Sequence, residues 1–258
     1  MSKLAERIRR TLQANSKPMG FAAAARAPNP SLLLAASFSA PAADRAAKAL
    51  AQGADTCLFA VGDVKSSELE AMVKAMGDAP LGIWPQRLDR QVVEKLSGSG
   101  VDYVVFNPEA AAATALLESD LGYVLAHEGD LADIYVRTLQ ALPLDAVFLR
   151  HWQSPLTVRG QMELIRIASL ANRPLMLTVA PEIEPKELES LRDSGVVIAA
   201  VDGDQKGTLE AMPALRKAVE ALPARRHRRE ERPEALVPRA EPAASSADEE
   251  EEDEDDSW

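Results

Sequence analysis

Five residues combine the side-chain types that acid-base chemistry needs, and each stands at or just after the end of a short apolar run. Histidine can transfer protons near neutral pH, a carboxylate can act as general base, and arginine can neutralise an oxyanion. We therefore predict a catalytic group made of His127, Glu128, Arg150, His151 and Asp202. This group favours lyase or isomerase chemistry on a small anionic metabolite, with His127 or His151 as the proton carrier.

Six further residues stand at comparable positions and are predicted to bind the substrate. A tryptophan can form the wall of a site for a planar or apolar group. The segment 202–208 has two glycines, a lysine and a helix start, which is half of a phosphate-binding loop. The other half would come from segment 180–185, but its prolines lack N–H donors and its acids repel an anion. The predicted substrate-binding residues are Trp84, Gln86, Asn107, Trp152, Gly203 and Lys206.

The elements that must position these residues alternate between 31 and 222. Apolar runs begin near residues 32, 55, 81, 102, 121, 145, 175 and 197, and segments rich in helix-forming residues separate them. Gly53, Gly100 and Gly195 precede three of the runs, where a glycine can take the left-handed turn that leads from a helix into a strand. Eight strands alternating with eight helices predict an α/β fold, a (β/α)8 barrel.

In size and order this pattern resembles the TIM-type barrels over residues 31–222, and an open doubly wound sheet is the alternative. The resemblance implies parallel strands whose carboxyl ends meet at one mouth, which would gather the predicted site residues. Neighbouring residues on a strand face opposite sides. His127 and Glu128 are therefore not both expected to face the lumen, nor are Arg150 and His151.

A metal centre is the first alternative chemistry. The placement of His127, His151 and Asp202 is similar to that of the ligands and base of the amidohydrolase barrels. The sequence departs from that pattern, because residues 37–39 read Ser-Phe-Ser where the family has a His-x-His pair, and Asn107 replaces its bridging lysine. Too few nitrogen ligands remain for zinc, so we predict no metal site and assign no cofactor. The sequence leaves open whether carboxylates bind a hard cation.

Composition divides the chain into three predicted parts. Residues 1–30 form a short N-terminal helix, with Leu4, Ile8 and Leu12 at helical spacing, and a loop. Residues 31–222 form the barrel, and residues 223–258 form a disordered tail that is basic and then acidic. This tail carries 6 Arg and 13 acids, a charge of −7 out of −11, which leaves −4 for the rest. The acidic tail suits basic partners or serves solubility.

The lone cysteine, Cys57, lies in an apolar run and predicts a reducing, cytoplasmic setting. The sequence shows no signal peptide and no apolar run long enough to span a membrane, and a mildly acidic body argues against nucleic-acid binding. The sequence leaves open whether the chain forms a homo-oligomer. The alternative function is a non-catalytic barrel that acts as a binding or scaffold module with a charged tail.

Overall fold

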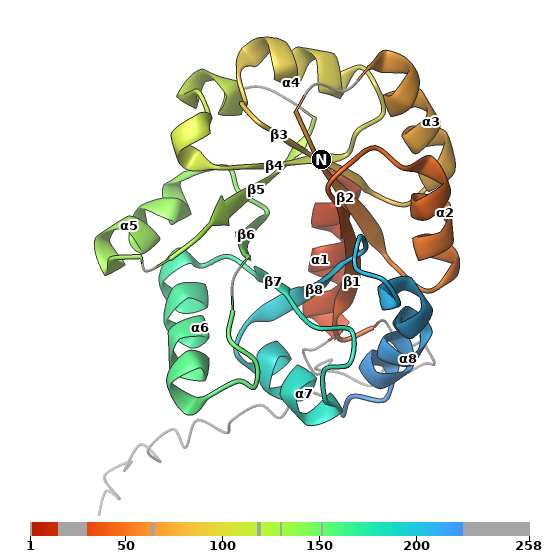
Figure 1. Ribbon diagram of the computed structural model, residues 1–258. Coiled ribbons are helices and arrows are strands. Elements are labelled where there is room, and N and C mark those ends of the chain that lie inside the picture. Colours follow the sequence, from red (N-terminus) through yellow and green to blue (C-terminus); the bar gives the residue numbers. More distant parts are fainter. Residues whose placement is uncertain are drawn as a thin grey trace, which may run out of the picture. The chain divides into compact units, whose positions relative to one another are not determined.

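Eight parallel strands close into a barrel in the order β1 to β8, which confirms the predicted (β/α)8 fold (Figure 1). The computed structural model describes residues 2–14, 30–62, 65–117, 120–129, 131–150 and 152–223. Each strand pairs with the next, and β8 pairs with β1. The strands are β1 (Leu33–Phe38), β2 (Thr56–Val61), β3 (Leu81–Pro85), β4 (Tyr103–Phe106), β5 (Gly122–His127), β6 (Ala146–Leu149), β7 (Leu175–Thr178) and β8 (Val196–Asp202).

Helices surround the strands as an outer layer, and one further helix precedes them (Figure 1). The helices are α1 (Lys3–Ala14), α2 (Ala43–Ala51), α3 (Ser66–Met76), α4 (Arg90–Ser97), α5 (Asp133–Thr138), α6 (Val158–Ala171), α7 (Pro185–Asp193) and α8 (Thr208–Glu220). Gly53, Gly100 and Gly195 have φ angles of 103°, 88° and 104° before β2, β4 and β8, which confirms their predicted left-handed turns.

The prediction of a helix after the fourth strand is wrong. Two short 3-10 turns, η1 (Pro108–Ala110) and η2 (Ala113–Leu116), take its place. Backbone hydrogen bonds tie this segment to the loop after β3: Leu88 donates to Ala110, and Ala112 donates to Leu88. These bonds use amide and carbonyl groups that a continuous helix would need for itself.

Alternate residues of each strand contribute to two separate apolar clusters. The inner cluster fills the lumen and includes Leu58, Val105, Val124 and Phe148. The outer cluster lies between the strands and the helix layer, and it takes the other half of each strand. Because the side chains alternate, the parity of a residue at the end of a strand decides whether it faces the mouth or the helices.

Helix α1 closes the N-terminal end of the barrel. Leu4 and Ile8 pack into the inner cluster, and Figure 1 shows α1 within the ring of strands. The Asp102 carboxylate accepts hydrogen bonds from the amides of Lys3 and Leu4 at 2.6 and 2.8 Å, so it caps the helix. The Ser2 hydroxyl donates to Asp145 at 3.2 Å. Ligand access is therefore left to the opposite end.

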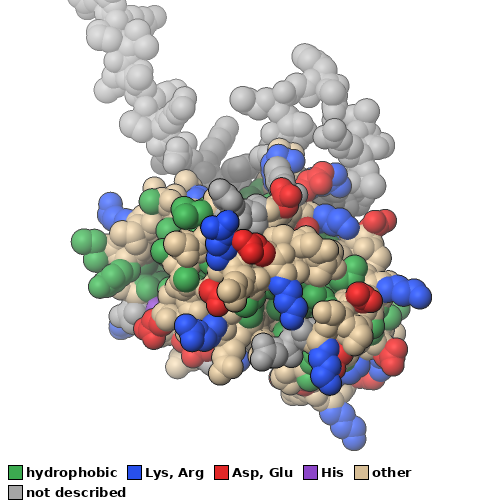
Figure 2. Space-filling model, turned by 90° about the horizontal axis from the view of Figure 1, so that it is seen from above, with side chains coloured by type: hydrophobic (Ala, Val, Ile, Leu, Met, Phe, Trp, Pro, Cys, Tyr) green, Lys and Arg blue, Asp and Glu red, His purple; other side chains and the backbone are tan. Residues whose placement is uncertain are grey.

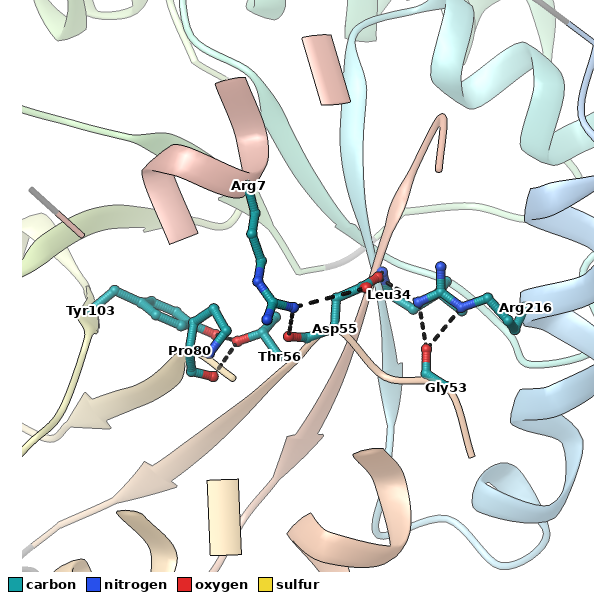
Figure 3. A network of polar contacts seen from close by, with 8 residues as sticks. All are labelled: Arg7, Leu34, Gly53, Asp55, Thr56, Pro80, Tyr103 and Arg216. Carbon is teal, nitrogen blue, oxygen red and sulfur yellow. Dashed lines mark hydrogen bonds and ion pairs between the residues drawn. The ribbon is translucent and has the colours of Figure 1, made fainter. Parts of the chain in front are cut away.

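A polar network stiffens the same N-terminal end (Figure 3). Asp55 accepts a hydrogen bond from the Leu34 amide at 2.8 Å and forms an ion pair with Arg216 at 2.5 Å. Arg7 of α1 donates to the Asp55 carbonyl at 2.8 Å. Asp55 therefore links α1, the start of β2 and α8.

The structure does not test two other predictions. Apart from Pro223, the predicted tail lies outside the described residues, and the predicted domain boundaries stay predictions. Across the described parts of the chain, none of the helices combines the length and apolar character that a membrane span requires.

Figure 2 shows Lys and Arg side chains interspersed with Asp and Glu on the face that it views.

Candidate functional site

The strand register brings Glu128 and Arg150 side by side at the C-terminal mouth. His127 of β5 pairs with Leu149 of β6, and Leu149 lies in the outer cluster. The next residue along each strand, Glu128 or Arg150, therefore lies on the lumen side. The Arg150 Nη1 donates to the Glu128 Oε1 at 3.0 Å. The two side chains are 46% and 51% exposed, so the ion pair is open to solvent and to a ligand.

Arg150 also reaches across the mouth to β3. Its guanidinium carbon lies 4.9 Å from the centre of the Trp84 ring, within cation-π range. The Trp84 ring meets Phe148 edge-on at 5.9 Å and packs against the inner cluster, which holds its orientation. Trp84 and Arg150 thus join two strands that are not neighbours in the barrel.

A cavity of about 410 Å³ opens beside this cation-π pair. Small residues from the end of β2 and the loop after it form one side, and Arg150 forms another. Gly62 faces Gln86, since a Cβ placed there would lie 3.9 Å from the Gln86 Oε1. We call this cavity the mouth pocket; its lining residues are Ala60, Val61, Gly62, Trp84, Pro85, Gln86 and Arg150.

A second arginine-aromatic arrangement lies at the loop between β8 and α8. The Arg45 guanidinium carbon lies 4.8 Å from the Phe38 ring centre, and its Nη1 is 2.6 Å from Asp204. Arg45 also donates to the Gly203 carbonyl, and the Ser39 amide donates to Asp204 at 2.6 Å. Burial opposes the charged form of Asp204, but the hydrogen bonds from Ser39 and Arg45 outweigh it and lower the pKa of this carboxyl.

The loop pocket, which is the cavity of about 420 Å³ beside this arrangement, contains two predicted substrate-binding residues, Gly203 and Lys206. Gly203 is required by close packing, since a Cβ there would lie 2.4 Å from the Phe38 ring. Arg45, which also lines the loop pocket, already forms an ion pair with Asp204 and donates a hydrogen bond to the Gly203 carbonyl. The structure places Gly203 and Lys206 together, in a pocket that shares no lining residue with the mouth pocket.

Asn107 and Asp202 occupy lumen-facing positions at strand ends but serve local turns. The Asn107 Oδ1 accepts a hydrogen bond from the Glu109 amide at 3.0 Å. The Asp202 Oδ1 accepts one from the Asp204 amide at 2.9 Å. Both residues are exposed, so their remaining polar atoms face the mouth without forming part of the mouth pocket.

His127 is not among the residues that line the mouth pocket. Tyr123 and Leu125, which share its parity on β5, lie in the outer cluster, so His127 is directed toward the helix layer. Trp152 also packs on the outer cluster, where a Cβ on Gly160 of α6 would lie 3.3 Å from its ring. His151 lies outside the described residues.

Sequence reasoning missed the β2 side of the pocket and the role of Arg45. Ala60 and Gly62 carry no chemical signal of their own, and Arg45 lies within a predicted helix, away from any strand end. Among the residues that the structure describes, no cluster of three or more His, Cys, Asp or Glu side chains is arranged to hold a metal ion.

Comparison with known proteins identifies the fold and no family. No protein-family model and no curated protein matches the chain. A thiamine phosphate pyrophosphorylase from Pyrococcus furiosus is similar with a TM-score of 0.57 and 16% identity, over 74% of this chain and 96% of its own. A tryptophan synthase structure from M. tuberculosis is similar with a TM-score of 0.62 and 10% identity, over 87% of this chain and 100% of its own. KGPDC from Streptococcus mutans is similar with a TM-score of 0.59 and 11% identity, over 74% of this chain and 98% of its own.

Proposed function

We propose that the protein is an enzyme of lyase or isomerase type that acts on a small anionic metabolite in the mouth pocket. One observation carries the proposal: Arg150 spans the mouth between Glu128 and Trp84. This arrangement combines a cation that can hold an anion, a carboxylate that can accept a proton, and an aromatic wall. The proteins of similar structure, which include a thiamine phosphate pyrophosphorylase and a tryptophan synthase, support a metabolic enzyme.

Substrate binding in this proposal depends on Arg150, Trp84 and Gln86. The cavity of about 410 Å³ falls in the range typical of small-molecule sites. Arginine can bind a carboxylate or phosphate through two parallel hydrogen bonds. Trp84 covers the planar or apolar part of the substrate, and the Gln86 amide binds a polar group.

The anion of the substrate competes with Glu128 for the Arg150 guanidinium. Binding would therefore break the Arg150–Glu128 hydrogen bond at the moment when a proton must be removed from the substrate. The proton moves to a Glu128 oxygen, and Arg150 stabilises the negative charge that develops on the substrate oxygen. Asp202 is the second carboxylate at the mouth. Glu128 takes the role that the sequence assigned to His127, and a role for His151 stays a prediction.

A thermal-shift screen tests this function. The probes are inorganic phosphate and a panel of small mono- and dicarboxylates and phosphate esters, applied to the wild type, Arg150→Ala and Arg45→Ala. Arg45 is the matched control, because it also lies over an aromatic ring beside an acid. We expect at least one probe to stabilise the wild type and Arg45→Ala but not Arg150→Ala. Stabilisation that survives in Arg150→Ala and is lost in Arg45→Ala would move the site to the loop pocket.

The ion pair itself favours a second candidate function. Glu128 and Arg150 neutralise each other as they stand, which suits a non-catalytic binding or scaffold module with no ready base. In that function the charged tail contacts basic partners, so deletion of residues 248–256 should weaken partner capture. The module binds its ligand without chemical change, whereas the enzyme converts it. Under either proposal the protein acts in the cytoplasm.

A further inference from the structure

Large apolar side chains are exposed mainly on one side of the helix layer. Five of the seven large exposed apolar residues of the described chain lie on α5 and α6, and the other two are Leu12 and Leu117. These five side chains are between 45% and 74% exposed. We call this surface the α5–α6 face; it consists of Ile134, Tyr135, Val158, Met162 and Ile165.

The three residues on α6 form a straight stripe. Val158, Met162 and Ile165 are spaced by four and then three residues, so they lie on one side of the helix. Leu164, Ile167 and Ala171 are buried and anchor the opposite side to the barrel. The apolar stripe therefore points away from the core, and most of its surface stays in contact with water in a single chain.

Helix α5 continues the apolar surface beside this stripe. Arg166 of α6 pairs with Asp133 and donates to the Leu131 carbonyl at 2.9 Å, so the first turn of α5 is held against α6. Ile134 and Tyr135 follow Asp133 directly and are 71% and 66% exposed. Figure 1 shows α5 and α6 as neighbours in the helix layer.

We infer that the α5–α6 face binds the same face of a second copy of this chain, with the two α6 helices antiparallel across a two-fold axis at Met162. The stripe is self-complementary in this arrangement. Val158 lies four residues before Met162 and Ile165 three residues after it, so Val158 of each copy meets Ile165 of the other. A two-fold interface requires this reciprocity.

The area of the face fits a dimer. The five side chains are 45–74% exposed and leave on the order of 600 Å² of surface in water, which is the upper end of the largest apolar patch on a typical monomer. A stable dimer buries about 800 Å² per partner, so this apolar centre with a polar rim is sufficient. A smaller ligand would leave much of the face uncovered.

The charges at the rim are also complementary. Arg159 is exposed and lies seven residues before Arg166, so both are on the flank of α6 that faces α5. Across the two-fold axis, Arg159 of one copy comes level with residue 165 of the other, beside the ion pair that Arg166 forms with Asp133. The Asp133 side chain is 60% exposed and can accept this second arginine.

Sedimentation velocity on the full chain tests the dimer. The wild type should sediment at twice the chain mass of 27.8 kDa. Met162→Lys should sediment as a monomer, because two like charges would meet at the axis, while the matched control Leu117→Lys should stay a dimer. Met162 is 66% exposed, so the substitution leaves the barrel intact, and circular dichroism checks this. A monomeric wild type at about 100 μM, or a dimer that Met162→Lys does not dissociate, would overturn the inference.

Cysteine cross-linking tests the antiparallel geometry. Cys57 has 0% exposure, and burial raises the pKa of its thiol to about 12, so it does not compete near pH 8. Under mild oxidation, an equal mixture of Val158→Cys and Ile165→Cys should form mixed dimers faster than either variant alone. Met162→Cys should cross-link to itself and Leu117→Cys should not. Self-linking of Val158→Cys that is as fast as mixed linking would overturn the antiparallel arrangement.

Discussion

The Arg150 guanidinium carbon lies 4.9 Å from the Trp84 ring centre while its Nη1 lies 3.0 Å from the Glu128 Oε1. One cation thus serves both a carboxylate and an aromatic wall across the mouth. The bond to Glu128 is exposed, and exposed ion pairs contribute at most about 1 kcal/mol. A ligand anion can therefore displace Glu128 at little cost.

Glu128→Gln separates binding from chemistry. The substitution removes the charge that competes for Arg150, so anion affinity should rise by about two- to fivefold. Loss of the base should lower turnover by at least about 100-fold. Calorimetric titration measures the first effect and product formation the second. Unchanged turnover in this variant would remove Glu128 from the catalytic role.

Gly62→Leu tests the pocket without disturbing the core. A Cβ at Gly62 would meet only the Gln86 Oε1, at 3.9 Å, so the new side chain would extend into the mouth pocket. Ligand binding should be lost while the unfolding free energy changes by less than about 1 kcal/mol. Thermal unfolding with and without ligand reports both quantities. Full binding by this variant would place the ligand elsewhere.

The sequence was sufficient to predict the strands, their order and the alternation of side chains. That alternation implied that His127 and Glu128 could not both face the lumen, and the structure has Glu128 on the lumen side. The choice between them depends on which face of β5 turns inward, and residues 123–126 are apolar and buried on both faces, so the local pattern does not encode it. The contact between Arg150 and Trp84 joins β6 to β3 across the mouth, and such contacts depend on closure of the barrel.

The N-terminal end of the lumen depends on one glycine. A Cβ on Gly82 would lie 2.2 Å from the Tyr103 Cζ. The Tyr103 hydroxyl lies 3.0 Å from the Thr56 hydroxyl (Figure 3), so the ring can move away only by losing this hydrogen bond. Gly82→Ala should lower the unfolding free energy by about 3 kcal/mol. Gly98→Ala is the control, because its nearest neighbour would be 3.9 Å away. Denaturant unfolding measures the difference, and equal stability of the two variants would contradict this packing.

Asp145 gives a pH-dependent prediction. Burial raises the pKa of its carboxyl despite the hydrogen bond from Ser2. The folded state therefore holds this proton more tightly than the unfolded state, and stability is lost as the pH rises from the usual aspartate value of 3.8 through the raised pKa. Asp145→Asn keeps an acceptor for Ser2 and removes the charge.

We expect Asp145→Asn to be more stable than the wild type at pH 7, with a gain that disappears below about pH 3.5. Chemical unfolding at a series of pH values measures this difference. Asp78→Asn, at an exposed position, is measured in parallel as the control for the substitution itself. A gain that grows toward acidic pH would reverse the sign and contradict the raised pKa.

Calorimetric titration of the ligand with the largest thermal shift tests the mouth pocket most directly, using the wild type, Arg150→Ala and Arg45→Ala. Hydrogen bonds to a charged group contribute about 1.5–3 kcal/mol, so Arg150→Ala should weaken binding by at least about tenfold. Arg45→Ala should bind as the wild type does. Equal affinity in the wild type and Arg150→Ala would contradict the account, because the anion would then be held without the cation that spans the mouth.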